Sequence, residues 1–136
     1  MRGGSAEGLF IKRMRDIKFR GRTQAGEWVY GDYHKRAGNV HCILTMEPDD
    51  EGKVSYVANQ VDADTVGQFT GLHDKNGEEI YEGDVYRFEH PDSINEVSYC
   101  IGGGFAGFDF APAFTDNNRL TNIEVIGNIH DNPELL

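Results

Sequence analysis

The chain has 136 residues, with 23 acidic against 13 basic side chains and a formal net charge of −10. This charge argues against direct binding to a nucleic-acid backbone, which requires clustered lysine and arginine. No apolar run approaches the ~20 residues that cross a bilayer, and no signal-peptide pattern is present, so we expect a soluble cytoplasmic protein of one domain.

The N-terminal part of the chain predicts a leader followed by a hairpin region. We interpret residues 1–13 as an appended or disordered leader, because the strand pattern begins only after Met14. Residues 14–61 form the hairpin region. Strands are expected there over residues 17–20, 27–33, 41–46 and 54–58, paired in that order across turns rich in glycine and acidic residues.

The first hairpin carries both aromatic and basic side chains. Trp28 and Tyr30 share one face of their strand because side chains alternate with a period of two. Lys18, Arg20 and Arg22 are too few for a nucleic-acid surface, and we expect them on a solvated strand face.

The middle of the chain predicts a short helical turn and then a bent hairpin. Asp62 can cap one turn that ends near Val66. Asn76 and Gly77 lie between strand-forming runs and favour a tight turn, because both accept positive φ. The pair Gly83 and Asp84 interrupts the following strand and predicts a bend. Small, strongly bent barrels begin with such a segment.

The C-terminal part predicts a further strand pair and a closing strand. Residues 96–101 and 105–110 are expected to pair around the glycines at positions 102–104, and residues 123–129 to close the sheet. The aromatic residues Phe105, Phe108, Phe110 and Phe114 have two interpretations. They form the barrel core, or they are a recognition platform for a basic or neutral peptide.

Three segments resemble the YopX family of phage and prophage proteins. Residues 70–85 read TGLHDKNGEEIYEGDV, residues 14–20 read MRDIKFR, and residues 125–136 read VIGNIHDNPELL. The resemblance spans residues 14–136 with a variable middle at 35–56, and it departs from the family at Ala63, where proline is expected. It implies an all-β protein with an SH3-like small barrel at residues 62–136 and a phage or prophage origin. Together with the lack of a membrane or signal segment, this origin leads us to expect the cytoplasm of a host cell. It implies no known activity and no catalytic residues.

No motif in the chain specifies a reaction. The glycines at 102–104 lack the lysine and hydroxyl residue of a phosphate-binding loop, and they fit a hairpin turn. No elbow motif surrounds a serine. The five histidines, His34, His41, His73, His90 and His130, lack metal-ligand spacing. We therefore assign no catalytic residue, no metal ligand and no cofactor. Cys42 and Cys100 are expected to be free thiols.

We predict a non-enzymatic phage or prophage accessory protein that acts through protein contacts and self-association. The chain has 8 Phe, 6 Tyr and 1 Trp, which are difficult to bury in so small a protomer, and exposed strand edges recruit other chains. The candidate interface residues are Trp28, Tyr30, Phe105, Phe108 and Phe110. The first alternative is a nucleic-acid-associated or DNA-mimicking regulator, because SH3-like barrels occur among nucleic-acid binders and an acidic surface can imitate phosphate. The third interpretation is a small hydrolase or metal enzyme, which would require a polar cleft with convergent catalytic groups.

Overall fold

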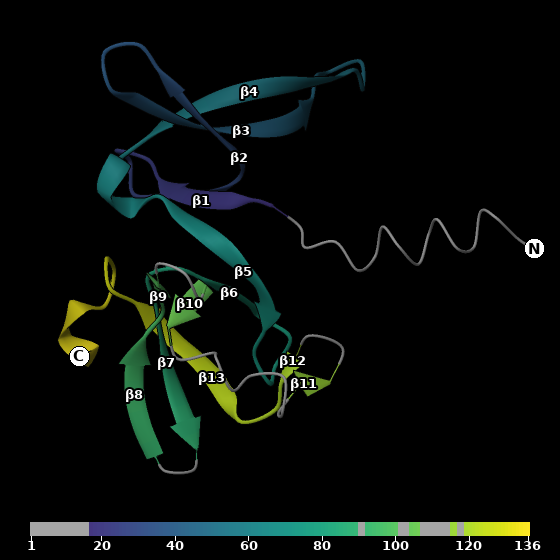
Figure 1. Ribbon diagram of the computed structural model, residues 1–136. Coiled ribbons are helices and arrows are strands. Elements are labelled where there is room, and N and C mark those ends of the chain that lie inside the picture. Colours follow the sequence, from purple (N-terminus) through teal and green to yellow (C-terminus); the bar gives the residue numbers. More distant parts are fainter. Residues whose placement is uncertain (1–16, 90–91, 101–103, 107–114, 117–118) are drawn as a thin grey trace, which may run out of the picture.

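A computed structural model describes residues 17–89, 92–100, 104–106, 115–116 and 119–136 (Figure 1). The prediction of an all-β protein is confirmed. Over these residues the chain forms short strands and two single-turn 3₁₀ helices, η1 (Ala63–Thr65) and η3 (Pro133–Leu135). Within the same ranges, no helix is long and apolar enough to cross a membrane. The leader at residues 1–13 lies outside the described residues.

Four strands form an antiparallel meander at the N-terminal end. They are β1 (Phe19–Arg22), β2 (Trp28–Arg36), β3 (Val40–Pro48) and β4 (Val54–Val61). The two predicted hairpins are confirmed as β1–β2 and β3–β4, and pairing of β2 with β3 joins them into one meander. The sequence did not predict this joining, because the pattern of each hairpin says nothing about its neighbour.

Strand β2 changes partner in its middle at Gly31. Residues up to Gly31 pair with β1, and residues from Asp32 onward pair with β3. A Cβ atom on Gly31 would lie 2.0 Å from the carbonyl oxygen of Leu44. Only glycine therefore lets β3 cross β2 this closely.

A short turn leads from the meander into the central hairpin. Asp62 caps η1 as predicted, and its side chain accepts a hydrogen bond from the Asp64 amide. Strand β5 (Gly67–His73) then pairs antiparallel with β1 and with β6 (Glu79–Tyr81). The sheet therefore continues across position 61. The division into residues 14–61 and 62–136 stays a prediction.

The tight turn between β5 and β6 is organised by Asp74. Its backbone amide donates to the Glu78 carbonyl, and Gly77 donates to the Asp74 carbonyl. Gly77 has a φ of 84°, the left-handed value that such a turn requires. Gly83 has a φ of 91° and separates β6 from β7 (Asp84–Glu89), where the sequence predicts a bend.

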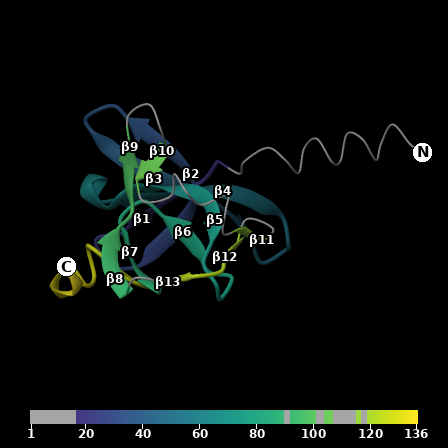
Figure 2. The same cartoon turned by 60° about the horizontal axis from the view of Figure 1, so that its bottom comes forward.

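The C-terminal strands form two further small sheets. β7 pairs with β8 (Asp92–Glu96) and with β13 (Ile123–Asn128), and all three strands are in front in Figure 2. β9 (Ser98–Cys100) pairs with β10 (Gly104–Ala106) around the glycine run, as predicted over its described part. β11 (Thr115–Asp116) and β12 (Arg119–Leu120) add a small edge beside β5. The sequence analysis missed β8, β11 and β12.

The described strands do not close into a barrel. They make three separate sheets, so the SH3-like barrel over residues 62–136 is not confirmed. The core lies between these sheets and contains Ile80, Tyr86, Val97, Leu120 and Ile123, all at most 4% exposed. β-branched and aromatic side chains of this kind favour strands because they pack well on a pleated surface.

Candidate contact surface

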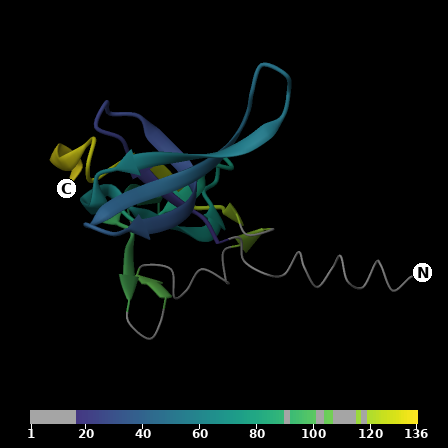
Figure 3. The same ribbon diagram turned by 90° about the horizontal axis from the view of Figure 1, so that it is seen from above.

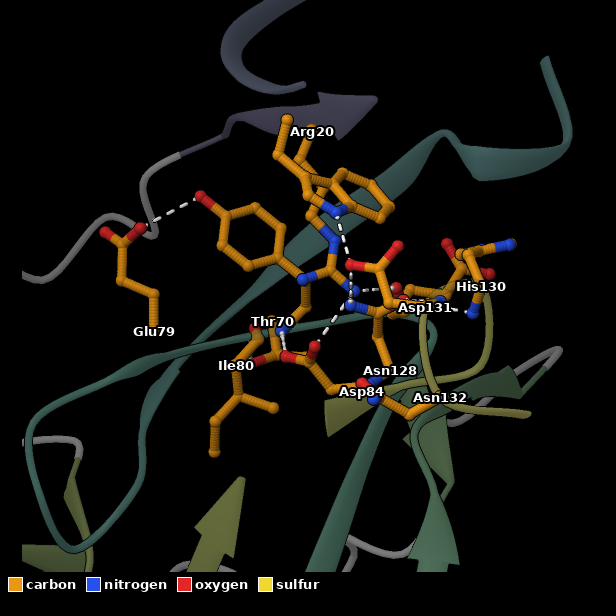
Figure 4. Close-up of polar contacts among 12 residues, drawn as sticks. Arg20, Thr70, Glu79, Ile80, Asp84, Asn128, His130, Asp131 and Asn132 are labelled. Atoms are coloured by element: carbon orange, nitrogen blue, oxygen red, sulfur yellow. Dashed lines mark hydrogen bonds and ion pairs between the residues drawn. The ribbon is translucent and has the colours of Figure 1, made fainter. Parts of the chain in front are cut away.

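The basic residue Arg20 is buried where the meander meets the C-terminal strands. Arg20 is only 6% exposed, so the expectation of a solvated face was wrong for this residue. Its guanidinium donates to Asp84 at 2.9 Å, and both side chains are almost fully buried. Figure 4 shows Arg20 directed toward Asp84 across the two parts of the fold. A buried charge requires such a partner.

Two aromatic rings enclose the Arg20 guanidinium. Its central carbon lies 4.7 Å from the centre of the Trp28 ring and 5.0 Å from that of Tyr81. Tyr30 packs against Tyr81 with ring centres 5.5 Å apart. Trp28 and Tyr30 thus share one face, and this face contacts their own protomer. Their role at an interface between chains stays a prediction, and Tyr30 remains 48% exposed.

Burial and charge act in opposite directions on Asp84. Burial raises the pKa of the Asp84 carboxyl, and the positive charge of Arg20 opposes that rise. Asp84 also accepts a hydrogen bond from the Tyr81 amide at 2.7 Å. The pair Gly83 and Asp84, predicted only as a bend, therefore also places the carboxylate that neutralises Arg20.

A second carboxylate contact joins the C-terminal end of the chain to the first hairpin. Asp131 accepts a hydrogen bond from the Trp28 indole at 2.8 Å and pairs with Arg22. These hydrogen bonds lower the pKa of Asp131, and the one from Trp28 has the largest effect. His130 lies beside the Trp28 ring, and burial together with the nearby Arg20 and Arg22 lowers its pKa. The contacts fix the chain end against the meander.

The fully buried Asp74 has a structural task as well. One carboxylate oxygen accepts hydrogen bonds from the Asn76 and Glu78 amides, and the other accepts from Val125, each at 2.9 Å. Asp74 therefore closes the tight turn and attaches it to β13. Three amide donors use most of the about four acceptor positions of a carboxylate, which leaves a fully buried Asp74 little capacity for a ligand.

A hollow of about 440 Å³ opens beside Arg20. Its wall is acidic and aromatic, with Tyr30, Tyr81, Glu78 and Glu79 among its residues. Burial raises the pKa of both tyrosines, so their hydroxyls stay protonated. The Tyr81 hydroxyl donates to Glu79, which also pairs with Lys18. Tyr81, Glu79 and Lys18 therefore satisfy one another, whereas the buried Nε of Arg20 has no hydrogen-bond partner among the described residues.

The histidine and cysteine side chains do not gather into a metal-binding group in the described part of the chain. No group of three His, Cys, Asp or Glu side chains there could hold a metal ion. His90 lies outside these residues. Cys42 is a buried free thiol, 2% exposed, while the side chain of Cys100 lies outside the description. For Phe105 the structure describes only the backbone, which lies in β10. Phe108, Phe110 and Phe114 are outside the described residues.

The sequence analysis missed an exposed apolar surface on the β3–β4 hairpin. β3 pairs with β2 only as far as Leu44, so residues 45–48 and 54–57 with their turn form a two-stranded arm. Figure 3 shows this hairpin projecting from the rest of the protein. Asp49 holds the turn, since its carboxylate accepts from the Glu51 and Lys53 amides at 2.9 and 2.8 Å.

The two faces of the arm differ in character. Cross-strand partners lie on the same face, and here Met46 pairs with Tyr56 and Pro48 with Val54. These four residues form the apolar face. Met46 is 62% exposed, Val54 51% and Tyr56 65%. The opposite face is polar except for Val57, which is 37% exposed. Its polar residues bond one another: Thr45 donates to Glu47, and Asn59 donates to Thr45.

A sequence pattern could have revealed this arm. The strand β4, VSYVANQV, contains no charged residue and no proline, in a chain of which 26% is charged. It lies at the edge of the sheet order. Edge strands normally carry charges or proline that block pairing with other chains. An uncharged edge strand that exposes apolar side chains is therefore a candidate contact surface.

The described fold and contacts define an all-β protein in which ion pairs join an N-terminal meander to C-terminal strands. The chain belongs to the YopX protein family, whose model matches residues 18–136. It is also similar to the crystal structure of protein EF1440 from Enterococcus faecalis, at 27% sequence identity and a TM-score of 0.56. That match covers 90% of this chain and 99% of the other. The search of curated proteins gives no match.

Proposed function

We propose that this protein is a non-enzymatic accessory protein of a phage or prophage, and that it acts in the host cytoplasm through protein contacts made by the apolar face of the arm. The observation that carries the proposal is the exposure of Met46, Val54 and Tyr56 on one face of a projecting hairpin. Apolar side chains gathered on a soluble protein typically mark an interaction site.

Beyond Leu44, the arm is held only by pairing between its own two strands, because β3 no longer pairs with β2 there. A two-stranded ribbon is marginally stable in water on its own. Its polar face and its turn are satisfied by Thr45, Asn59 and Asp49. Its apolar face gains stability only when another surface covers it, because removal of apolar area from water is favourable.

The basic residues of the first hairpin support protein contacts over binding to nucleic acid. Lys18, Arg20 and Arg22 each pair with a carboxylate of the C-terminal half. Their charge is therefore used within the fold, whereas a phosphate backbone requires cations that face solvent. Tyr30, beside the acidic hollow, is a second candidate contact point.

Site-specific photocrosslinking tests this proposal. A photoreactive phenylalanine analogue replaces Tyr56 on the apolar face, and in a matched variant it replaces Ser55, the adjacent residue on the polar face. Both positions are exposed on β4. We expect protein adducts from position 56 in host cells and few from position 55. Equal adducts from both positions, or none from position 56, would contradict the proposed function.

A further inference from the structure

We propose that the partner of the apolar face is a second copy of this chain, so that two arms pack face to face about a two-fold axis. This inference rests on the proposed function and names the occupant of the same surface. Figure 3 shows the arm extending away from the other strands, where a second molecule can approach it.

The charge of the chain favours an uncharged contact between copies. Each chain carries a formal net charge of −10, so two copies repel each other unless the carboxylates stay outside the interface. Met46, Pro48, Val54 and Tyr56 carry no charge at neutral pH, and β4 contains no ionisable group except the Tyr56 phenol. The apolar face is therefore a surface on which two such acidic chains can meet.

The pattern of the face is self-complementary. The pair Met46 and Tyr56 lies in the middle of the arm, and Pro48 and Val54 lie toward its tip. In an antiparallel face-to-face arrangement, a two-fold axis across the central pair places Tyr56 of one copy against Tyr56 of the other and Met46 against Met46. Two aromatic rings pack favourably in an offset geometry. Two sheets that pack in this way lie about 10 Å apart, which leaves room for these side chains.

The size of the face predicts a weak dimer. Side chains of these types with these exposed fractions offer on the order of 400 Å² per copy, less in total than the roughly 1,200 Å² of a stable complex. We therefore expect dissociation in the micromolar range. Dimerisation should strengthen with added salt, because screening reduces the repulsion between the acidic chains.

The oligomeric state of the full chain tests this inference. The wild type is compared with Tyr56→Lys and Met46→Lys on the apolar face and with Ser55→Lys on the polar face, by light scattering and sedimentation from about 1 to 100 µM. All three variants gain the same positive charge and become less acidic. Loss of association therefore cannot come from greater net repulsion. Thermal unfolding of each variant shows that it is folded.

We expect the wild type and Ser55→Lys to approach twice the 15.2 kDa monomer mass, and Tyr56→Lys and Met46→Lys to remain monomers. A monomeric wild type at all concentrations overturns the inference. So does equal dissociation of the apolar-face and polar-face variants, or association that none of them changes. If the wild type is monomeric but position 56 crosslinks a different protein, this inference fails while the proposed function stands.

Discussion

Replacement of Arg20 by methionine should destabilise the protein strongly. Methionine keeps much of the length of the side chain and its contact with the aromatic rings, but it removes the charge. Asp84, 2% exposed, would then be a buried carboxylate whose cationic partner is gone. Loss of one member of a buried ion pair costs about 3–5 kcal/mol of unfolding free energy.

The exposed ion pair between Lys75 and Glu89 provides the matched control. Both of its side chains are about one-third exposed, at 35% each. Lys75→Met should therefore destabilise the protein far less than Arg20→Met, because solvent screens such pairs. In urea, a loss of about 3 kcal/mol should lower the unfolding midpoint by roughly 1–3 M for a protein of this size, while the control should shift it little.

The destabilisation by Arg20→Met should depend on pH. Burial already raises the pKa of Asp84, and removal of Arg20 takes away the charge that opposes this rise. A folded-state pKa above the unfolded value of about 3.9 means that the unfolded state loses its proton first as the pH rises. The variant should thus lose more stability relative to wild type at pH 7 than at pH 5.

A double variant makes the interpretation sharper. Asp84→Asn removes the charge that Arg20→Met leaves unpaired, and it keeps an oxygen that can accept from the Tyr81 amide. Arg20→Met with Asp84→Asn should therefore be more stable than Arg20→Met alone at pH 7. A loss below about 1 kcal/mol in the single variant, no pH dependence, or no recovery in the double variant would refute the buried-pair argument.

Two glycine substitutions test the backbone of the fold. Gly77→Val should cost about 1 kcal/mol or more, because Gly77 has a φ of 84° and a β-branched residue is strained there. No atom lies within 4 Å of its Cβ position, so an unchanged thermal midpoint would argue against the strained turn. Gly31→Ala should cost about 1–3 kcal/mol, since its Cβ would lie against the Leu44 carbonyl. Hydrogen exchange of β3 amides should accelerate in this variant, and unchanged protection would contradict the close crossing.

The sequence predicted those parts of the fold that depend on local patterns. The turn at Asn76 and Gly77, the bend at Gly83 and the cap at Asp62 each follow from the conformational preference of one or two residues. The first two hairpins follow from alternation and turn composition. Each of these features is decided within about ten residues, the range over which a pattern can be read without knowledge of the tertiary structure.

The features that the sequence did not predict depend on contacts between distant segments. Arg20 and Asp84 are 64 positions apart, and Trp28 and Asp131 are 103 apart, so no local pattern indicates that they meet. An arginine in a strand is exposed by default, and only its tertiary partner makes burial possible. β8 was missed for a related reason. Its sequence, DSINE, is polar, and only its pairing with β7 makes it a strand.

The arm and the three segments that resemble the family have different physical roles. Asp74, Gly77, Gly83 and Asp84, all within residues 70–85, close turns or neutralise a buried charge, and the Asp131 carboxylate fixes the chain end. Substitutions of these residues should mainly lower the stability of the fold. The arm, residues 45–57, lies outside these segments, and Tyr56 on it is 65% exposed. Substitutions on its apolar face remove few intramolecular contacts, so they should change association with little effect on folding. Stability and association should therefore respond to different substitutions, the first to those within residues 70–85 and the second to those on the apolar face of the arm.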